Sequence, residues 1–140
     1  MASPNLIASV KKHEGFRSKP YVDTTGNITV GWGRNLDANP LSPEEAELLF
    51  ENDLLRAVDG AEKFVSNFGE LDEVRQSTLI EMCFNLGLKK LTGFKKFKAA
   101  VEAKDFPEAY TQMLDSLWAK QVGYRSQVLA YQMLTGEWAP

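Results

Sequence analysis

Two acidic residues near the N-terminus, Glu14 and Asp23, are the first candidates for chemistry. Glu14 falls at the end of a predicted helix and Asp23 in a predicted turn, and the chain between them is too short to separate them widely. Two carboxyl groups facing one cleft can hydrolyse a glycosidic bond, because the protonated group donates its proton to the leaving oxygen while the ionised group activates water or attacks the sugar. Carboxyl pKa values near ~4 leave both groups ionised at neutral pH, so the acid needs an environment that raises its pKa. Packing of the helix end against Phe16 would provide that for Glu14, although a solvated Glu and a turn Asp are the commoner explanation of the spacing alone.

The surrounding segments predict how these residues are positioned. Ser3-Pro4 is a helix start and Gly15 a helix stop, so a short helix carries Leu6, Ile7 and Val10 on one face and ends at Glu14. Residues 19–34 predict a β-hairpin, with Asp23-Thr24-Thr25-Gly26 as its turn. Gly31-Trp32-Gly33 then gives a backbone with little side-chain bulk, suited to close approach by a neighbour or a ligand.

The rest of the chain predicts helices. Ser42-Pro43-Glu44-Glu45 is a capping box that begins a helix with apolar residues at helical spacing up to Gly60. Further helices are expected over residues 71–86, around 94–101, from Asp105 onward, and over residues 126–135. The helix from Asp105 is expected to bury Ala109, Met113, Leu117 and Trp118. One small hairpin in an otherwise helical chain predicts an α+β fold.

Composition narrows the classes of function. The chain has 140 residues, enough for one domain or two small lobes that share a core. The single Cys83 and the single His13 exclude a disulfide framework and Cys- or His-rich metal sites. A formal net charge of −3 argues against a dedicated nucleic-acid binder. No secretory signal and no apolar run of the ~18 residues that a membrane span needs can be identified.

A longer set of motifs resembles the active-site region of phage-type lysozymes, glycoside hydrolase family 24. The matching strings, in order and with matching spacing, are His13-Glu14-Gly15-Phe16, Pro20-Tyr21-Val22-Asp23, Gly26 and Thr29-Val30-Gly31-Trp32-Gly33. Later residues resemble the helical lobe of that family: Val74-Arg75, Phe84-Asn85-Leu86-Gly87, Gly93-Phe94, Trp118, Arg125 and Thr135-Gly136-Glu137-Trp138. The resemblance covers nearly the whole chain. It implies a single lysozyme-like catalytic domain, with a hairpin lobe at about 14–41, a linking helix at about 43–59, a helical lobe at about 61–140 plus the N-terminal helix, and a cleft between the lobes.

The resemblance also implies roles for individual residues. Glu14 matches the general acid, Asp23 the residue that orients or activates water, and Thr29 the threonine that helps to hold that water. Arg125 matches an arginine that pairs with the acid and would lower its pKa, in opposition to apolar packing. Asn85 matches a polar position facing the cleft, and its alternative role is a satisfied amide at a helix end.

Trp32 is a candidate for stacking on a sugar ring, whereas core packing is the expectation for Trp118 and Trp138. Arg34 stands where the family commonly has His, so we expect an altered ion pair there with no effect on catalysis. The segment from Arg34 to Ser42 is shorter than in the long phage representatives, which predicts a trimmed small lobe.

The activity implied is hydrolysis of the β-1,4 bond between N-acetylmuramic acid and N-acetylglucosamine in peptidoglycan, with inversion and without metal or cofactor. Inverting carboxyl pairs stand about 6.5–9.5 Å apart. The chain resembles an endolysin: a monomer without stable membrane insertion that accumulates in the host cytoplasm and reaches the wall after holins open the inner membrane. A lytic transglycosylase, a non-catalytic wall-binding module and a helical interaction domain are the alternatives.

Two other features have ordinary explanations. Lys89, Lys90, Lys95, Lys96 and Lys98 alternate with apolar residues, which favours a solvated helix face over attraction to anionic envelope polymers or a membrane surface. Cys83 is expected to be a small core residue rather than a nucleophile.

Overall fold

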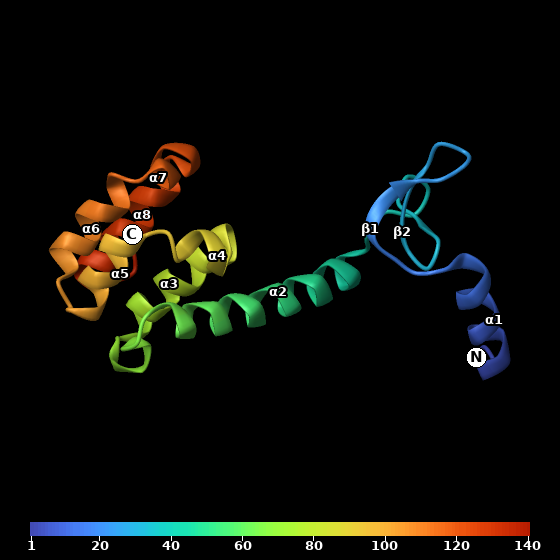
Figure 1. The fold of residues 1–140 in the computed structure, drawn as a ribbon, viewed down its shortest axis with the longest axis horizontal. Helices are drawn as coiled ribbons and strands as arrows, with labels where there is room; N and C mark the ends of the chain where they lie inside the picture. The colour runs from blue at the N-terminus through green and yellow to red at the C-terminus, as the bar shows by residue number, and fades with distance from the viewer. The chain divides into compact units, whose positions relative to one another are not determined.

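The computed structural model describes residues 1–140 and is predominantly helical, with one small antiparallel sheet. Figure 1 shows the order of the elements. They are α1 (Pro4–Glu14), β1 (Arg17–Val22), β2 (Ile28–Gly31), β3 (Arg34–Asn35), α2 (Pro43–Phe64), the 3-10 helix η1 (Phe68–Glu70), α3 (Glu73–Leu86), α4 (Leu88–Leu91), α5 (Lys95–Glu102), α6 (Phe106–Leu114), α7 (Leu117–Val122) and α8 (Tyr124–Thr135). The α+β class expected from the sequence is confirmed.

The chain divides into two compact units, Met1–Leu49 and Phe50–Pro140. Unit 1 contains α1, the sheet and the first part of α2, and unit 2 contains the remaining helices. Each unit is compact by itself. The predicted cleft between two lobes, and the grouping of the N-terminal helix with the helical lobe, therefore stay predictions.

Unit 1 is built from local signals that the sequence contains. Ser3 caps α1 by accepting a hydrogen bond from the Leu6 amide, and Gly15 ends the helix with a φ of 73°. The sheet has the order β1-β2-β3, with Tyr21 opposite Thr29 and Val30 opposite Arg34. The short strand β3 was not predicted, because Arg34 and Asn35 are too few residues to show a strand pattern.

The capping box at the start of α2 forms as predicted. The Glu45 amide donates to Ser42 Oγ at 3.1 Å, and the Ser42 amide donates to Glu45 Oε1 at 2.9 Å. The helix does not end at Gly60, however, and continues to Phe64. Gly60 is buried, and a Cβ added there would lie 2.5 Å from Cys83 Sγ of α3. Glycine is thus explained by close packing of two helices rather than by a helix end.

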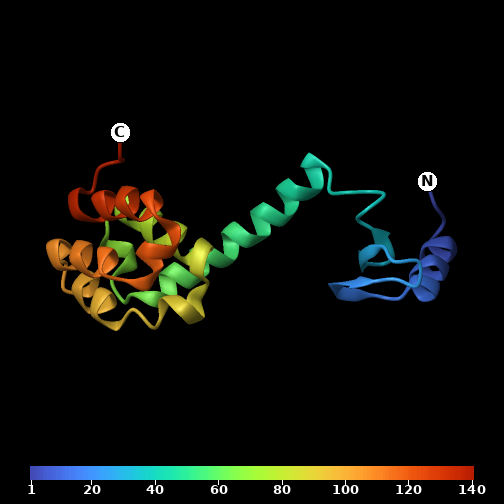
Figure 2. The same cartoon turned by 90° about the horizontal axis from the view of Figure 1, so that it is seen from above.

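Unit 2 surrounds one hydrophobic core. Its fully buried side chains include Phe64, Leu79, Met82, Leu91, Phe97, Met113, Leu129 and Met133. Helix α6 packs against α5 and α8, and α3 packs against α8 (Figure 2). These packed helices bury the faces that the sequence pattern marks as apolar.

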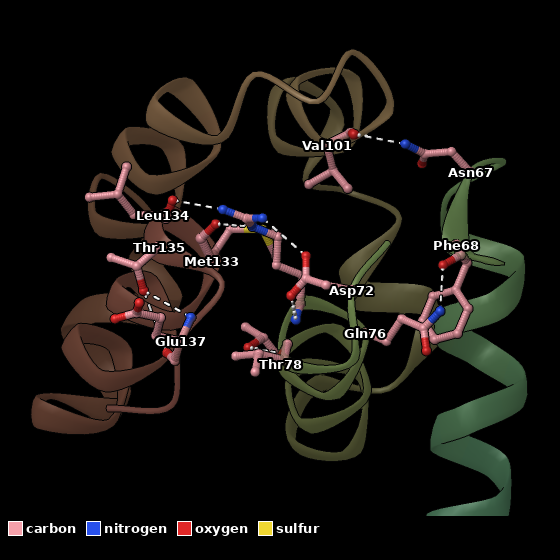
Figure 3. A network of polar contacts seen from close by, with 12 residues as sticks. Asn67, Phe68, Asp72, Gln76, Thr78, Val101, Met133, Leu134, Thr135 and Glu137 are labelled. Atoms are coloured by element: carbon pink, nitrogen blue, oxygen red, sulfur yellow. Dashed lines mark hydrogen bonds and ion pairs between the residues drawn. The ribbon is translucent and has the colours of Figure 1, made fainter. Parts of the chain in front are cut away.

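Polar contacts join segments of unit 2 that are far apart in the sequence. Arg75 of α3 donates to the carbonyls of Met133 and Leu134 at 2.7 and 2.8 Å, near the end of α8. The side-chain amide of Asn67 donates through Nδ2 to the Val101 carbonyl at 3.0 Å (Figure 3). Such bonds satisfy carbonyl groups near helix ends that have no partner within their own helix.

The helix predicted from Asp105 is shorter than expected. Asp105 caps α6 and Ala109 and Met113 are buried as predicted, but α6 ends at Leu114. Ser116 caps a new helix, α7, which leaves Leu117 exposed at 68% while Trp118 is buried. The prediction that Leu117 faces the core is therefore wrong, because a Ser at a capping position restarts the helix with a different orientation.

Candidate active site

Asp23 is held in the turn between β1 and β2 by three hydrogen bonds to one oxygen. Its Oδ1 accepts from the amide of Asn27 at 2.8 Å and from the hydroxyl and amide of Thr25 at 2.8 and 2.9 Å. The bonds from Asn27 and Thr25 lower the pKa of Asp23 below its ordinary value, because they favour the ionised form. The side chain is thus an oriented carboxylate at neutral pH, and its second oxygen, Oδ2, receives no hydrogen bond within unit 1.

Thr29 lies on β2, and its side chain is the one fully buried side chain of unit 1, with 3% exposed. Its hydroxyl donates to the carbonyl of Asn27 at 3.0 Å. The same carbonyl accepts the backbone amide of Asp23 at 2.9 Å. Asp23 and Thr29 are therefore fixed by a common residue, Asn27, and the turn holds both side chains in one small region.

Glu14 is the last residue of α1, and its side chain is exposed. It has no hydrogen-bond or ion-pair partner within unit 1. Its carboxyl group instead lies against the backbone of Gly33, where an added Cβ would stand 2.8 Å from Glu14 Cδ and closer still to Oε2. The low bulk of the Gly31-Trp32-Gly33 segment predicted close approach by a neighbour or a ligand, and at Gly33 that neighbour is the candidate acid.

The aromatic residues near Glu14 pack on each other. The rings of Phe16 and Trp32 are stacked, with centroids 4.9 Å apart, and Lys11 Nζ lies 4.3 Å from the Trp32 ring centre. Phe16 remains 57% exposed and Trp32 48% exposed. Unit 1 therefore does not supply the buried apolar environment expected around Glu14, and stacking of the half-exposed Trp32 on a sugar ring stays a prediction.

Arg34 forms the altered ion pair expected at this position, and its partner is Glu45. The guanidinium binds the Glu45 carboxylate through both terminal nitrogens, at 2.8 Å for Nη2 to Oε1. It also donates to the carbonyls of Asn39 and Pro40, each at 2.7 Å. Arg34, followed by Ser42, lowers the pKa of Glu45 to about 2. The sequence indicates Glu45 only as a capping residue and does not predict its ion pair with Arg34. The available signal was the capping box, which fixes the position of the Glu45 carboxylate.

Two predicted site residues belong to unit 2 and have partners there. Asn85 accepts a hydrogen bond from Trp118 Nε1 at 2.8 Å, as expected of a satisfied amide at a helix end. Arg125 Nε donates to Glu81 Oε2 at 2.9 Å, a contact that the sequence did not indicate. The pairing of Arg125 with Glu14, and contact of either unit 2 residue with substrate, stay predictions.

The remaining candidates take ordinary places. Within the lysine-rich segment, Leu91 and Phe97 are fully buried while the lysines are exposed, which favours a solvated face over a membrane-lying helix. Cys83 is buried in the core, and this burial raises the pKa of its thiol, so it is not poised as a nucleophile. No group of three or more His, Cys, Asp or Glu side chains is arranged to hold a metal ion. None of the helices combines the length and the apolar character needed to cross a membrane.

Comparison with known proteins now decides the family. The family model for phage lysozyme matches residues 11–132, which include every residue of the candidate site. The chain belongs to the phage lysozyme family. As a member of this family it is a glycoside hydrolase of the muramidase type that acts on peptidoglycan.

The relatives of this chain differ in how much of their own length matches it. It is 27% identical to the probable T4-type lysozyme 2 of Dictyostelium discoideum, over 94% of this chain and 95% of the relative. It is 29% identical to the pre-baseplate central spike protein Gp5 of Enterobacteria phage T4, where it spans 28% of the relative, and 29% identical to the endolysin of Bacillus phage B103, where it spans 45%. The lysozyme domain thus occurs both as nearly a whole chain and as a part of longer proteins.

Proposed function

We propose that this phage lysozyme hydrolyses the β-1,4 bond between N-acetylmuramic acid and N-acetylglucosamine, with inversion at the anomeric carbon. Glu14 is the general acid, and Asp23 and Thr29 direct the attacking water. Trp32 stacks on a sugar ring, while Asn85 and Arg125 contribute to substrate binding. The reaction uses no metal or organic cofactor.

The observation that supports this proposal best is the different state of the two carboxyl groups. Asp23 is anchored through Oδ1 by three donors that keep it ionised, which leaves Oδ2 available to a water molecule. Glu14 has no hydrogen-bond partner within unit 1, so its carboxyl group is free to meet a substrate oxygen. The two groups therefore differ in what they offer: Asp23 presents an oriented oxygen to water, and Glu14 presents an accessible carboxyl group to the substrate.

The proposed reaction gives one proton to the leaving oxygen and takes one from the attacking water. Glu14 gives its proton to the glycosidic oxygen as the bond from that oxygen to the anomeric carbon breaks. Water attacks the same carbon from the opposite face and gives a proton to Asp23, while Thr29 orients the water through its hydroxyl. The products are two shorter glycan strands, one of which ends in a reducing N-acetylmuramic acid of inverted configuration.

Substitutions of the two acids test this assignment on isolated peptidoglycan. We expect Glu14→Gln to slow the release of reducing ends by about 100- to 10,000-fold while its circular dichroism spectrum is retained, because the amide keeps the shape and removes the proton donor. Glu47→Gln is the matched control, since Glu47 is an exposed glutamate of unit 1 without a side-chain partner there and loses the same charge. Full activity of Glu14→Gln would refute the acid assignment.

Product analysis tests the reaction type separately. Mass spectrometry should find reducing N-acetylmuramic acid ends, whereas anhydro ends would indicate a lytic transglycosylase. Proton NMR during the first minutes should show the α-anomer, because inversion of a β bond yields it before mutarotation. A β-anomer as first product would replace inversion by retention.

The biological setting proposed is lysis of a bacterial host for phage release. The protein would act as a monomer, accumulate in the host cytoplasm and reach the cell wall once holins permeabilise the inner membrane. Expression in a Gram-negative bacterium tests this route, because lysis should require co-expression of a holin or permeabilisation of the membrane. Lysis without either would contradict it.

A further inference from the structure

Gly33 stands out among the glycines of unit 1 by what surrounds it. Its φ is +75°, and a Cβ at this position would lie 2.8 Å from Glu14 Cδ and 3.2 Å from Glu14 Cγ. Ordinary contacts of a Cβ begin at about 3.4 Å. Gly15, Gly26 and Gly31 also have positive φ values, but an added Cβ at any of them meets nothing within 4 Å.

The backbone on which Gly33 lies is fixed from its C-terminal side. Val30 pairs with Arg34 across the turn between β2 and β3, and the Arg34 guanidinium is bound to Glu45 and to two loop carbonyls. The backbone at Gly33 therefore cannot retreat easily. An added side chain would instead displace the end of the Glu14 side chain, which is flexible and solvated.

A side chain at Gly33 should therefore affect the catalytic rate more than the folding stability. Moving an exposed glutamate carboxyl group to another rotamer costs little folding free energy. The same movement shifts the proton donor by more than half an ångström, and displacements of about 1 Å can cost ~100-fold in rate.

We propose that Gly33 is a positioning residue: its lack of a side chain gives the Glu14 carboxyl group the place from which it protonates the leaving oxygen. This inference rests on the proposed role of Glu14 as general acid. It assigns to Gly33 a part in the reaction that is distinct from the conformational demand of its positive φ.

Gly31→Ala is the matched control for Gly33→Ala. The two glycines lie two residues apart with φ values of +68° and +75°, so both substitutions impose the same kind of backbone strain. We expect similar decreases of the melting temperature in the two variants. On soluble, uncross-linked peptidoglycan strands, we expect kcat to fall about 10- to 100-fold for Gly33→Ala and no more than a few-fold for Gly31→Ala, with KM little changed.

A second comparison links the effect to the acid. In a Glu14→Gln background, Gly33→Ala should have no further effect on residual activity, because the proton donor whose place it alters is already absent. If Gly33→Ala does not fold, the pair Gly33→Asn and Gly31→Asn replaces it, since asparagine adopts positive φ more readily than alanine.

Each outcome decides between explanations. Equal kcat values for the Gly33 and Gly31 variants, or a loss confined to KM, would overturn the positioning role while an inactive Glu14→Gln leaves the proposed function standing. A fully active Glu14→Gln would overturn the proposed function itself. A large kcat loss at Gly33 alone, absent in the Glu14→Gln background, supports the inference.

Discussion

Replacement of Gly60 by alanine opposes two effects whose balance the structure decides. Gly60 lies inside α2, where alanine is ordinarily more favourable than glycine by about 1 kcal/mol per residue. Helix propensity alone therefore predicts that Gly60→Ala stabilises the protein.

Packing predicts the opposite sign. The new Cβ would lie 2.5 Å from Cys83 Sγ, which is itself buried in the core, and 3.5 Å from Leu88 Cβ. Since ordinary contacts begin at about 3.4 Å, the sulfur must move by nearly an ångström in a packed interior. Overpacking of this kind costs about 1–3 kcal/mol, so we expect a net destabilisation of up to about 2 kcal/mol once the propensity gain is subtracted.

Urea unfolding followed by tryptophan fluorescence and by circular dichroism measures the effect. The decisive variant is Gly60→Ala combined with Cys83→Ala, which removes the sulfur that the new methyl group meets. In the Cys83→Ala background, Gly60→Ala should be neutral or stabilising, and the two substitutions should show a coupling of at least ~1 kcal/mol. A Gly60→Ala protein that is more stable than the wild type would refute the packing argument.

Two further predictions concern other side-chain contacts. Glu45 has its pKa lowered to about 2 in the folded protein, so the stability that its ionised form contributes should be present above its ordinary pKa and disappear as pH falls toward 2. The melting temperatures of wild type and Glu45→Gln should therefore converge between pH 5 and pH 2. A difference that stays constant over this range would contradict the ion pair with Arg34. Asn85→Ala should lower the free energy of unfolding in urea by about 1 kcal/mol, because the Trp118 indole N–H loses its acceptor. Asn85→Asp should retain most of this stability. If Asn85→Ala costs as much in a Trp118→Phe background, the hydrogen bond is not the explanation.

The elements that the sequence predicts correctly are those specified by neighbouring residues. The capping box at Ser42 and the Asp105 cap both form as expected. So does the helix end at Gly15. In each case the residue that satisfies the helix end lies within four positions of it, so the pattern is visible in the sequence.

One error arises where a distant residue decides, and the other where a neighbouring cap competes with helical spacing. Gly60 was interpreted as a helix end because glycine usually has that meaning, but Cys83 is the reason for it. Leu117 fits the helical spacing of α6, yet Ser116 restarts the helix and exposes it. The contact of Gly60 with Cys83 leaves no local pattern in a single sequence, whereas the cap at Ser116 is a local signal that the helical spacing outweighed.

The candidate site shows the same division. The Asp23 turn and its link to Thr29 form within a few residues, and the motif that predicted them is compact. The contact between Glu14 and Gly33 joins a helix to a later turn, so the sequence indicated only that something approaches Gly33 closely.

One side chain holds the segment after Gly33 together. Arg34 lies at the start of the segment and reaches Asn39, Pro40 and Glu45 together. A guanidinium can do this because its donors point in several directions in one plane, whereas a lysine offers a single point charge. One side chain thus joins the ends of a loop that has no buried apolar residue of its own, and it holds in place the turn against which Glu14 lies.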